Sequence, residues 1–257
     1  MDLQLTNRIV FVGGASRGIG LAIAETCLAE GARVAISARG EQKLNTEKDR
    51  LREIYGKERI WSCAGDLTHT ETVENMVTAV EAEFGPIWGT VANVGLHPTP
   101  PGFDLSDDIW KEGFNQNLNS AFILSRAVLR HLEKRREGAI LLISSIAGMA
   151  ALETPLTYGT AKAATNHLAK ELARIVGPKG IRVNALAPGN IIFPGGDWEK
   201  RRNSDRGPAW DRWIKREVAL QRFGTPEEIG SAAAYMLSPL ASFMTGAIVP
   251  IDGGQTR

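Results

Sequence analysis

The chain has 257 residues, of which 43% are hydrophobic and 23% are charged, and its 30 Lys and Arg residues face 29 Asp and Glu residues. This composition is typical of a globular domain with a substantial core and excludes global disorder. A formal net charge of +1 argues against general nucleic-acid binding, which needs a basic excess. The N-terminus lacks the pattern of a signal peptide, and no apolar run reaches the roughly 20 residues that span a bilayer. We therefore expect a cytoplasmic protein with no membrane or nucleic-acid partner.

The cysteines and histidines indicate neither a disulfide framework nor a metal site. Cys27 and Cys63 are too few for either on their own, which favours a reducing compartment. Three of the histidines, His69, His131 and His167, show no ligand spacing with one another or with the cysteines. We therefore expect no bound metal.

Short apolar segments alternate with helical segments along most of the chain. Five apolar or β-branched runs predict buried strands at 9–12, 34–36, 60–63, 87–92 and 139–143. Helical periodicity predicts helices that include 19–28, 70–84 and 157–177, and a helix start at Thr225. On the helix 157–177, the apolar face is marked by Ala161, Ala164, Leu168, Leu172 and Ile175. Since strands that are apolar throughout are buried on both faces, this alternation predicts a doubly wound α/β fold with a parallel sheet.

A glycine cluster lies between the first predicted strand and the first predicted helix. It runs from Gly13 to Gly20 and also has glycine at positions 14 and 18. Glycines allow the backbone to turn tightly and approach a diphosphate, and the positive end of the following helix favours an anion. A plain tight turn is the alternative, but the position between strand and helix favours a dinucleotide site.

The end of the second predicted strand indicates which dinucleotide is bound. An acidic residue there would bind the adenosine ribose of NAD, whereas an arginine accommodates the additional phosphate of NADP. The chain has Ala38 and Arg39 at this place, and Arg17 in the glycine loop could supply a second cation. Arg39 could alternatively be a solvated residue before a turn. We predict NADP(H) as the cofactor.

A candidate acid/base pair lies in the last of the three helices. Tyr158 and Lys162 are four residues apart, so both point from one face. An ammonium beside a phenol favours the phenolate and would lower the tyrosine pKa toward neutrality. Ser145 follows the fifth predicted strand and Asn93 the fourth, and ligands of open parallel sheets sit at such strand ends. Asn117 lies in the helical segment between these two strands.

Taken together, these motifs resemble the short-chain dehydrogenase/reductase family. The motifs occur in the family's order: the glycine loop, Asn93-Val94-Gly95, Asn117, Ser145, Tyr158-x3-Lys162 and Pro188-Gly189. The match covers the chain from about residue 6 to Gly254. The resemblance implies one NADP-binding Rossmann domain over residues 1–257, with a seven-stranded parallel sheet flanked by helices. It also implies a homotetramer or homodimer.

The resemblance assigns a role to each matching residue. Tyr158 would be the general acid/base, and Ser145 would bind and orient the substrate carbonyl oxygen. Lys162 would bind the nicotinamide ribose and lower the tyrosine pKa, while Asn117 would hold a water that connects the lysine to solvent. The residues that would bind the cofactor are Gly14, Ser16, Arg17, Gly18, Ile19, Gly20, Arg39, Asp66, Leu67, Asn93, Gly95, Tyr158, Lys162, Pro188, Gly189 and Ile191.

The sequence departs from the family pattern at three places. Gly13 replaces a threonine and Val94 an alanine, and both changes are modest. Phe193 stands where many members have a threonine whose hydroxyl lies near the nicotinamide amide. Because Phe193 cannot make that hydrogen bond, cofactor placement there would rely on the backbone of Ile191 or on neighbouring residues.

The resemblance also implies that the segment 191–216 closes over the substrate as a lid. The pattern predicts a long irregular insertion, with Trp198, Trp210 and Trp213 and with seven basic against four acidic residues over 193–216. Its arginines could bind an anionic substrate, with Trp198 and the loop residue His97 lining the pocket. Alternatively, the segment is an amphipathic helix whose charges face water and whose tryptophans pack on the core or on a neighbouring subunit.

The function implied by the resemblance is NADPH-dependent interconversion of a ketone and a secondary alcohol. The small-molecule substrate could be a 3-oxoacyl thioester, a sugar or polyol, or a cyclic ketone. A non-catalytic dinucleotide sensor is the first alternative, and its mark would be loss of the tyrosine or lysine. Epimerase or dehydratase chemistry is the second, and the length of about 250 residues without an added domain counts against it.

Overall fold

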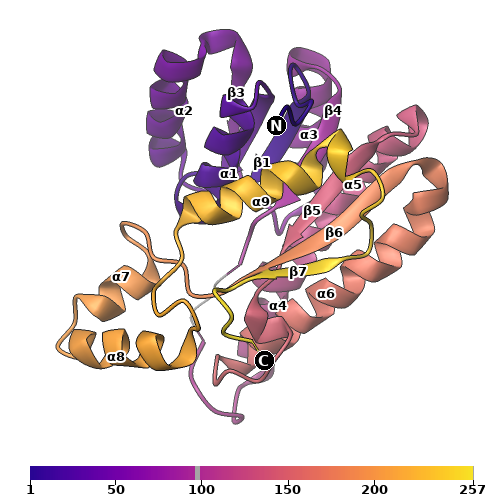
Figure 1. Ribbon diagram of the computed structural model, residues 1–257. Helices are drawn as coiled ribbons and strands as arrows, with labels where there is room; N and C mark the ends of the chain where they lie inside the picture. Colours follow the sequence, from indigo (N-terminus) through magenta and orange to yellow (C-terminus); the bar gives the residue numbers. More distant parts are fainter. Residues whose placement is uncertain (96–98, 257) are drawn as a thin grey trace.

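A computed structural model describes residues 1–95 and 99–256. Its strands form one seven-stranded parallel sheet in the order β3-β2-β1-β4-β5-β6-β7 (Figure 1). The strands are β1 Ile9–Gly13, β2 Arg33–Ala38, β3 Ile60–Ala64, β4 Ile87–Ala92, β5 Gly138–Ile143, β6 Ile181–Pro188 and β7 Ile248–Ile251. The predicted doubly wound α/β fold with seven parallel strands is confirmed, and the strand order reverses between β1 and β4.

Helices connect successive strands and return the chain to the same edge of the sheet. The helices are α1 Gly18–Ala29, α2 Glu41–Tyr55, α3 Thr70–Ala79, α4 Asp107–Phe114, α5 Ser120–Arg135, α6 Leu156–Val176, α7 Asp197–Arg202, α8 Gly207–Glu217 and α9 Pro226–Leu237. Two π-helical turns extend them, η2 Val80–Phe84 after α3 and η3 Asn115–Asn119 between α4 and α5. The predicted start at Thr225 is confirmed, because its side chain and that of Glu228 form a capping box at the N-terminus of α9.

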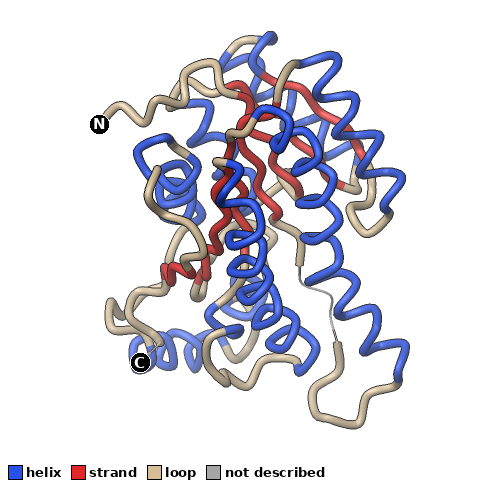
Figure 2. The backbone as a smooth tube through the Cα atoms, turned by 90° about the vertical axis from the view of Figure 1, so that its right-hand side faces the viewer, coloured by secondary structure: helices blue, strands red, loops and turns tan. Residues whose placement is uncertain are grey.

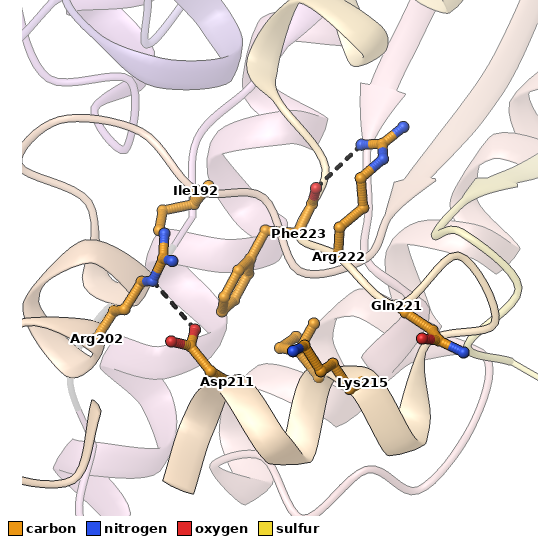
Figure 3. Close-up of a pocket in the computed structure, with 8 residues that line it drawn as sticks. Ile192, Arg202, Asp211, Lys215, Gln221, Arg222 and Phe223 are labelled. Carbon is orange, nitrogen blue, oxygen red and sulfur yellow. Dashed lines mark hydrogen bonds and ion pairs between the residues drawn. The ribbon is translucent and has the colours of Figure 1, made fainter. Parts of the chain in front are cut away.

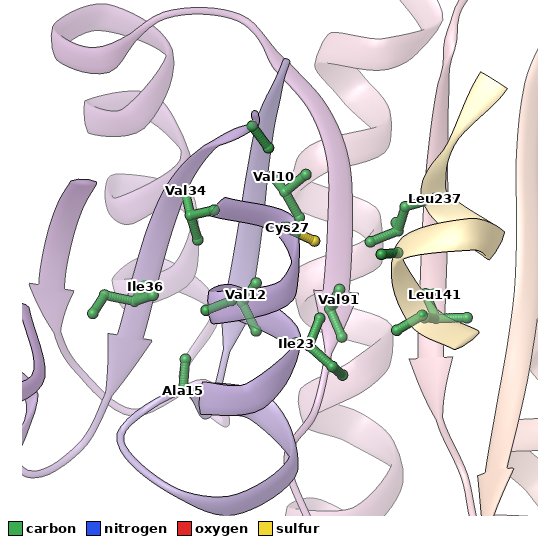
Figure 4. Close-up of a cluster of buried hydrophobic side chains, with 14 of the residues drawn as sticks. Val10, Val12, Ala15, Ile23, Cys27, Val34, Ile36, Val91, Leu141 and Leu237 are labelled. Carbon is green, nitrogen blue, oxygen red and sulfur yellow. The ribbon is translucent and has the colours of Figure 1, made fainter. Parts of the chain in front are cut away.

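The sheet is buried between two layers of helices (Figure 2). Side chains of α1, α2 and α9 cover one face, where Val10, Val12 and Val34 meet Ile23 and Cys27 of α1 (Figure 4). Side chains of α3, α5 and α6 cover the other face. Because both faces are covered, the strands carry apolar residues without alternation, as predicted.

One buried arginine ties the C-terminal end of α9 to the sheet. Arg182 on β6 is only 9% exposed. Its guanidinium donates to the carbonyl oxygens of Met236, Leu237 and Ser238 at 2.8, 3.3 and 3.0 Å. Met236 and Leu237 lie in the last turn of α9, where carbonyls have no intrahelical partner, and Ser238 follows the helix directly.

Two expectations about helices differ from the structure. The segment 193–216 is not irregular, because most of it forms α7 and α8 (Figure 1). The apolar face predicted for α6 is rotated from the buried one: Ile175 is 60% exposed, whereas Lys162 and Asn166 are buried. The buried face of α6 carries polar side chains because part of it faces the site described next.

Candidate active site

The glycine loop forms a cradle at the carboxyl end of β1. Gly14 and Gly18 have φ angles of +71° and +56°, which favour glycine. A side chain at Gly14 would collide with the carbonyl oxygen of Asn93, whose amide Nδ2 donates to the Gly14 carbonyl at 3.0 Å. Helix α1 begins at Gly18 and has no side-chain cap. The first N–H groups of this helix therefore have no side-chain acceptor, as an anion site at a helix N-terminus requires.

The ends of β2 and β3 bring Arg39 and Asp66 together. Arg39 Nη1 lies 3.9 Å from Asp66 Oδ2, and the Arg39 side chain is 68% exposed. Although burial acts against it, hydrogen bonds from Thr68 and the charge of Arg39 lower the pKa of Asp66. Leu67 is buried beneath Gly13. The residues predicted at the adenosine end thus lie next to one another, with the guanidinium accessible.

The predicted acid/base residues gather between α6 and the ends of β4 and β5. The hydroxyl of Tyr158 is hydrogen-bonded to that of Ser145. Lys162 Nζ lies 5.7 Å from the centroid of the Tyr158 ring. It donates to the carbonyl oxygens of Ile143 at 2.9 Å and of Val94 at 3.5 Å. The i, i+4 spacing therefore places a phenol, an ammonium and a serine hydroxyl in one cluster.

Asn117 faces the same cluster from η3. A Cβ atom added to Gly95 would lie 2.8 Å from Asn117 Oδ1 and 2.8 Å from Lys162 Nζ, so both atoms border one small space. The backbone carbonyl of Asn117 also accepts a hydrogen bond from Thr165 on α6. Glycine at 95 leaves this space open between the asparagine and the lysine.

Burial shifts the pKa values of both Tyr158 and Lys162. Burial raises the pKa of Tyr158, and the hydrogen bond from Ser145 opposes this effect. Burial lowers the pKa of Lys162 from 10.5 to about 8. The sequence predicted that Lys162 lowers the pKa of Tyr158, whereas burial is the largest influence on this pKa in the structure and raises it.

The segment after β6 is fixed by the C-terminal part of the chain. Gly189 N donates to the carbonyl oxygen of Ile251 at 3.0 Å, and a side chain at Gly189 would crowd Asp252. Ile191 is buried and pairs with Gly224 in an isolated bridge. Pro188, Gly189 and Ile191 thus continue the edge of the sheet on which the other predicted cofactor residues lie.

The lid is held by its own aromatic cluster. The Trp198 ring centroid lies 5.6 Å from that of Trp210, 5.7 Å from Trp213 and 5.3 Å from Phe223. The guanidinium of Arg201 stacks on Trp198 at 4.9 Å. Trp198, predicted to contact substrate, thus packs inside the lid, which fits the alternative of an amphipathic helix with packed tryptophans. His97, the other predicted substrate residue, lies outside the described residues.

A cavity of about 330 Å³ lies on the lid side of the molecule (Figure 3). It is lined by Ile192, Arg202, Asp211, Ile214, Lys215, Gln221, Arg222 and Phe223. None of the described catalytic candidates lines it. Two of its cations are paired, Arg202 with Asp211 at 3.0 Å and Arg222 with Glu228. We therefore place the site at the Ser145–Tyr158–Lys162 cluster and not in this cavity.

Two contacts between the lid and the glycine loop escaped the sequence analysis. The Phe193 ring lies against Gly18, and Arg17 Nη1 donates to the carbonyl oxygen of Gly195 at 3.1 Å. Phe193 was recognised only as a departure from the family pattern. The glycine pair at 195 and 196, two residues further on, is the sequence signal for such a close approach.

Within residues 1–95 and 99–256, no group of three or more His, Cys, Asp or Glu side chains could hold a metal ion. Over the same residues, no helix is both long and apolar enough to cross a membrane. The two cysteines are free, and Cys27 is buried.

The chain is similar to known proteins over its whole length. Residues 14–256 match the family model described as enoyl-(acyl carrier protein) reductase. The chain is 34% identical over 252 residues to 3-oxoacyl-(acyl-carrier-protein) reductase FabG of Vibrio cholerae serotype O1, covering 98% of each chain. It is 31% identical over 256 residues to 2-(S)-hydroxypropyl-CoM dehydrogenase 3 of Xanthobacter autotrophicus, covering 100% of this chain and 99% of the relative. The structure of L-sorbose reductase from Gluconobacter frateurii, complexed with NADPH and L-sorbose, matches with a TM-score of 0.93 and 29% identity, covering 100% and 99%.

Proposed function

Since the chain belongs to the short-chain dehydrogenase/reductase family of oxidoreductases, we propose that it interconverts a ketone and a secondary alcohol with NADPH as the hydride carrier. The observation that carries this proposal is the cluster of Ser145, Tyr158 and Lys162 at the carboxyl edge of the sheet, on the same edge as the glycine loop. A buried ammonium without a carboxylate partner lowers the stability of the folded chain, so the position of Lys162 favours a functional role.

The residues present fit a nicotinamide dinucleotide. The cradle at Gly14 admits no side chain, and the uncapped N-terminus of α1 at Gly18 presents N–H groups to an anion. These groups would bind the diphosphate, Asp66 and Leu67 would border the adenine, and Lys162 would reach the nicotinamide ribose. The remaining contacts expected from the sequence are those of Ser16, Ile19, Gly20, Asn93, Gly95, Pro188, Gly189 and Ile191.

The phosphorylated form of the dinucleotide is the better match to the end of β2. No carboxylate stands there to bind the ribose hydroxyls of NAD, and Arg39 presents an exposed guanidinium instead. Its neighbour Asp66 lies at 3.9 Å, so the ion pair is loose enough for a phosphate to compete. The related L-sorbose reductase was solved with NADPH, which supports the same choice.

The chemistry at the substrate carbonyl is proton transfer by Tyr158. Because its pKa is raised by burial, the phenol is protonated at neutral pH and can donate to the carbonyl oxygen during reduction. When the substrate binds, Ser145, which lies beside this hydroxyl, turns its one proton from Tyr158 to the same carbonyl oxygen and orients it. When bound, the nicotinamide supplies the hydride for reduction or accepts it in the reverse direction.

Lys162 and Asn117 supply a proton to the Tyr158 phenolate after each reduction. With a pKa of about 8, Lys162 is mostly protonated at pH 7, and its charge stabilises the phenolate that remains after proton donation. Asn117 borders the space beside Lys162 Nζ, where a water would connect the lysine to solvent. The pair thus restores the protonated tyrosine for the next turnover.

The substrate is a small carbonyl compound, and an anionic substrate is not favoured. Three of the seven lid cations are engaged within the lid, since Arg202 pairs with Asp211, and Arg201 and Arg206 stack on tryptophans. A homotetramer or homodimer is part of the proposal.

Tyr158→Phe tests the proposed function. NADPH oxidation is followed by its absorbance with a panel of sugar, acyl-thioester and cyclic ketones. The variant should lose most turnover, at least about a hundredfold, and keep its NADPH affinity. Tyr235→Phe is the matched control, because this exposed tyrosine on α9 should leave activity unchanged. Full activity of Tyr158→Phe would exclude the tyrosine as proton donor, and NADPH binding without turnover of any ketone would indicate a sensor.

A further inference from the structure

The first residues of the lid are docked on the glycine loop. The ring of Phe193 lies between two glycines: a Cβ atom added to Gly18 would lie 2.6 Å from the ring, and one added to Gly196 would lie 3.1 Å from it. Beside the ring, Arg17 Nη1 donates to the carbonyl oxygen of Gly195 at 3.1 Å. We call these two contacts the latch. They join segments that are far apart in the sequence and that meet only in the folded chain.

The latch lies on the part of the loop that the dinucleotide needs. Helix α1 begins at Gly18, and the diphosphate of a dinucleotide binds at the N-terminus of this helix. The Phe193 ring is in contact with Gly18 itself. Arg17 is a cation that the cofactor phosphates would attract, yet its guanidinium is bonded to the lid. The ring therefore covers surface that the diphosphate would cross.

The lid is built to move as one body when the latch is released. The rings of Trp198, Trp210 and Trp213 pack on one another. An ion pair of 3.0 Å between Arg202 and Asp211 joins α7 to α8. Figure 1 shows these two helices set apart from the layers that cover the sheet. Besides the latch, the packing of Trp198 on Phe223, which lies outside the lid, would have to shift.

We propose that Phe193 and Arg17 latch the lid onto the glycine loop, and that the diphosphate of the dinucleotide displaces this latch when it binds. Phe193 is then a residue that sets cofactor affinity by controlling access to Gly18. The inference rests on the proposed use of a dinucleotide. The threonine that many family members have at this position is expected to contact the cofactor directly. The phenyl ring of Phe193 instead competes with the cofactor.

The size of the effect follows from the closed fraction. A site that is open in only one molecule in ten binds its ligand about tenfold more weakly than an open site. For a latch that is closed in about nine molecules of ten, removing the ring in Phe193→Ala should lower the Kd for NADPH about tenfold, which corresponds to about 1.4 kcal/mol. Phe243→Ala is the matched control, because this phenylalanine is fully exposed and its removal should leave the Kd unchanged.

A ligand without the diphosphate bridge provides a second control. Adenosine 2′-phosphate would reach Arg39 and Asp66 but would not cross Gly18. Calorimetry should therefore give the same Kd for this ligand in wild type and in Phe193→Ala, whereas the Kd for NADPH falls. An equal NADPH affinity in the two proteins, or a weaker one in the variant, overturns the latch. If neither NADPH nor adenosine 2′-phosphate binds to the wild type, the proposed function is overturned together with the latch.

Association kinetics test the latch in the wild type, without relying on the alanine variant to fold. If the latch must open first, the observed rate of NADPH binding should level off at high NADPH concentration. Phe193→Leu keeps an apolar side chain for folding and removes the ring, and its rate should continue to rise with concentration. A linear dependence with the same slope in both proteins overturns the proposal.

Discussion

At neutral pH, the buried ammonium of Lys162 should lower the free energy of unfolding of the chain. Burial lowers the pKa of this lysine from 10.5 to about 8. Each pKa unit between the folded and the unfolded chain corresponds to about 1.4 kcal/mol, so confining the charge reduces the free energy of unfolding by about 3 kcal/mol below pH 8. Between pH 8 and 10.5 the unfolded chain binds the proton and the folded chain does not. This loss therefore disappears as pH rises through that window.

Lys162→Met removes the buried charge and should therefore recover the free energy of unfolding that the charge costs. The methionine fills a similar volume but gives up the hydrogen bonds to the carbonyls of Ile143 and Val94, together worth about 1–2 kcal/mol. We expect the variant to be inactive and about 1–2 kcal/mol more stable than wild type at pH 7. Near pH 10.5 the order should reverse, because only the lost hydrogen bonds remain.

Urea unfolding at a series of pH values measures this difference. Lys170→Met is the matched control, since this lysine lies on the same helix and is exposed, and its effect should not change across the window. Other lysines and tyrosines titrate in both proteins and cancel in the comparison. A wild-type-minus-variant difference that is the same at pH 7 and at pH 10 would show that the Lys162 pKa is not lowered, and the reasoning would fail.

Two further predictions concern Arg39 and Arg182. Arg39→Asp should raise the Kd for NADPH about tenfold or more and leave the Kd for NADH nearly unchanged, because only the phosphorylated cofactor uses the guanidinium. The two Kd values are measured by calorimetry, and an equal change for both cofactors would refute this prediction. Arg182→Met should lower the free energy of unfolding by about 1–3 kcal/mol, because the Met236 carbonyl loses its donor, while those of Leu237 and Ser238 keep the bonds from Trp88 and Ala241. A fall below 1 kcal/mol in urea unfolding would show that water replaces the guanidinium.

The features that the sequence predicted well depend on local patterns. Strands β1 to β5 were found because each is a short apolar run with a helical segment after it, and a sheet covered on both faces requires such runs. The glycine loop could be placed because it lies directly between β1 and α1. Tyr158 and Lys162 could be paired because an i, i+4 spacing on a helix fixes their common face.

The features that were predicted wrongly depend on contacts across the chain. The lid looked irregular because its glycines, proline and charges break it into short pieces, and only the packing of Trp198 on Trp210, Trp213 and Phe223 gives α7 and α8 a core. The face of α6 was misplaced because hydrophobicity alone assigns burial to Ile175, whereas the site buries Lys162 instead.

The surroundings of Lys162 explain why a charged side chain is buried here although it lowers the free energy of unfolding. Burial is the cause of its lowered pKa, and no carboxylate among the described residues contributes to the shift. Its partners are the carbonyl oxygens of Ile143 and Val94, which are dipoles without net charge. A carboxylate partner would relieve the burial but would cancel the positive field at Tyr158. Pairing the ammonium with backbone carbonyls keeps that field available to the phenolate, which is what proton transfer requires.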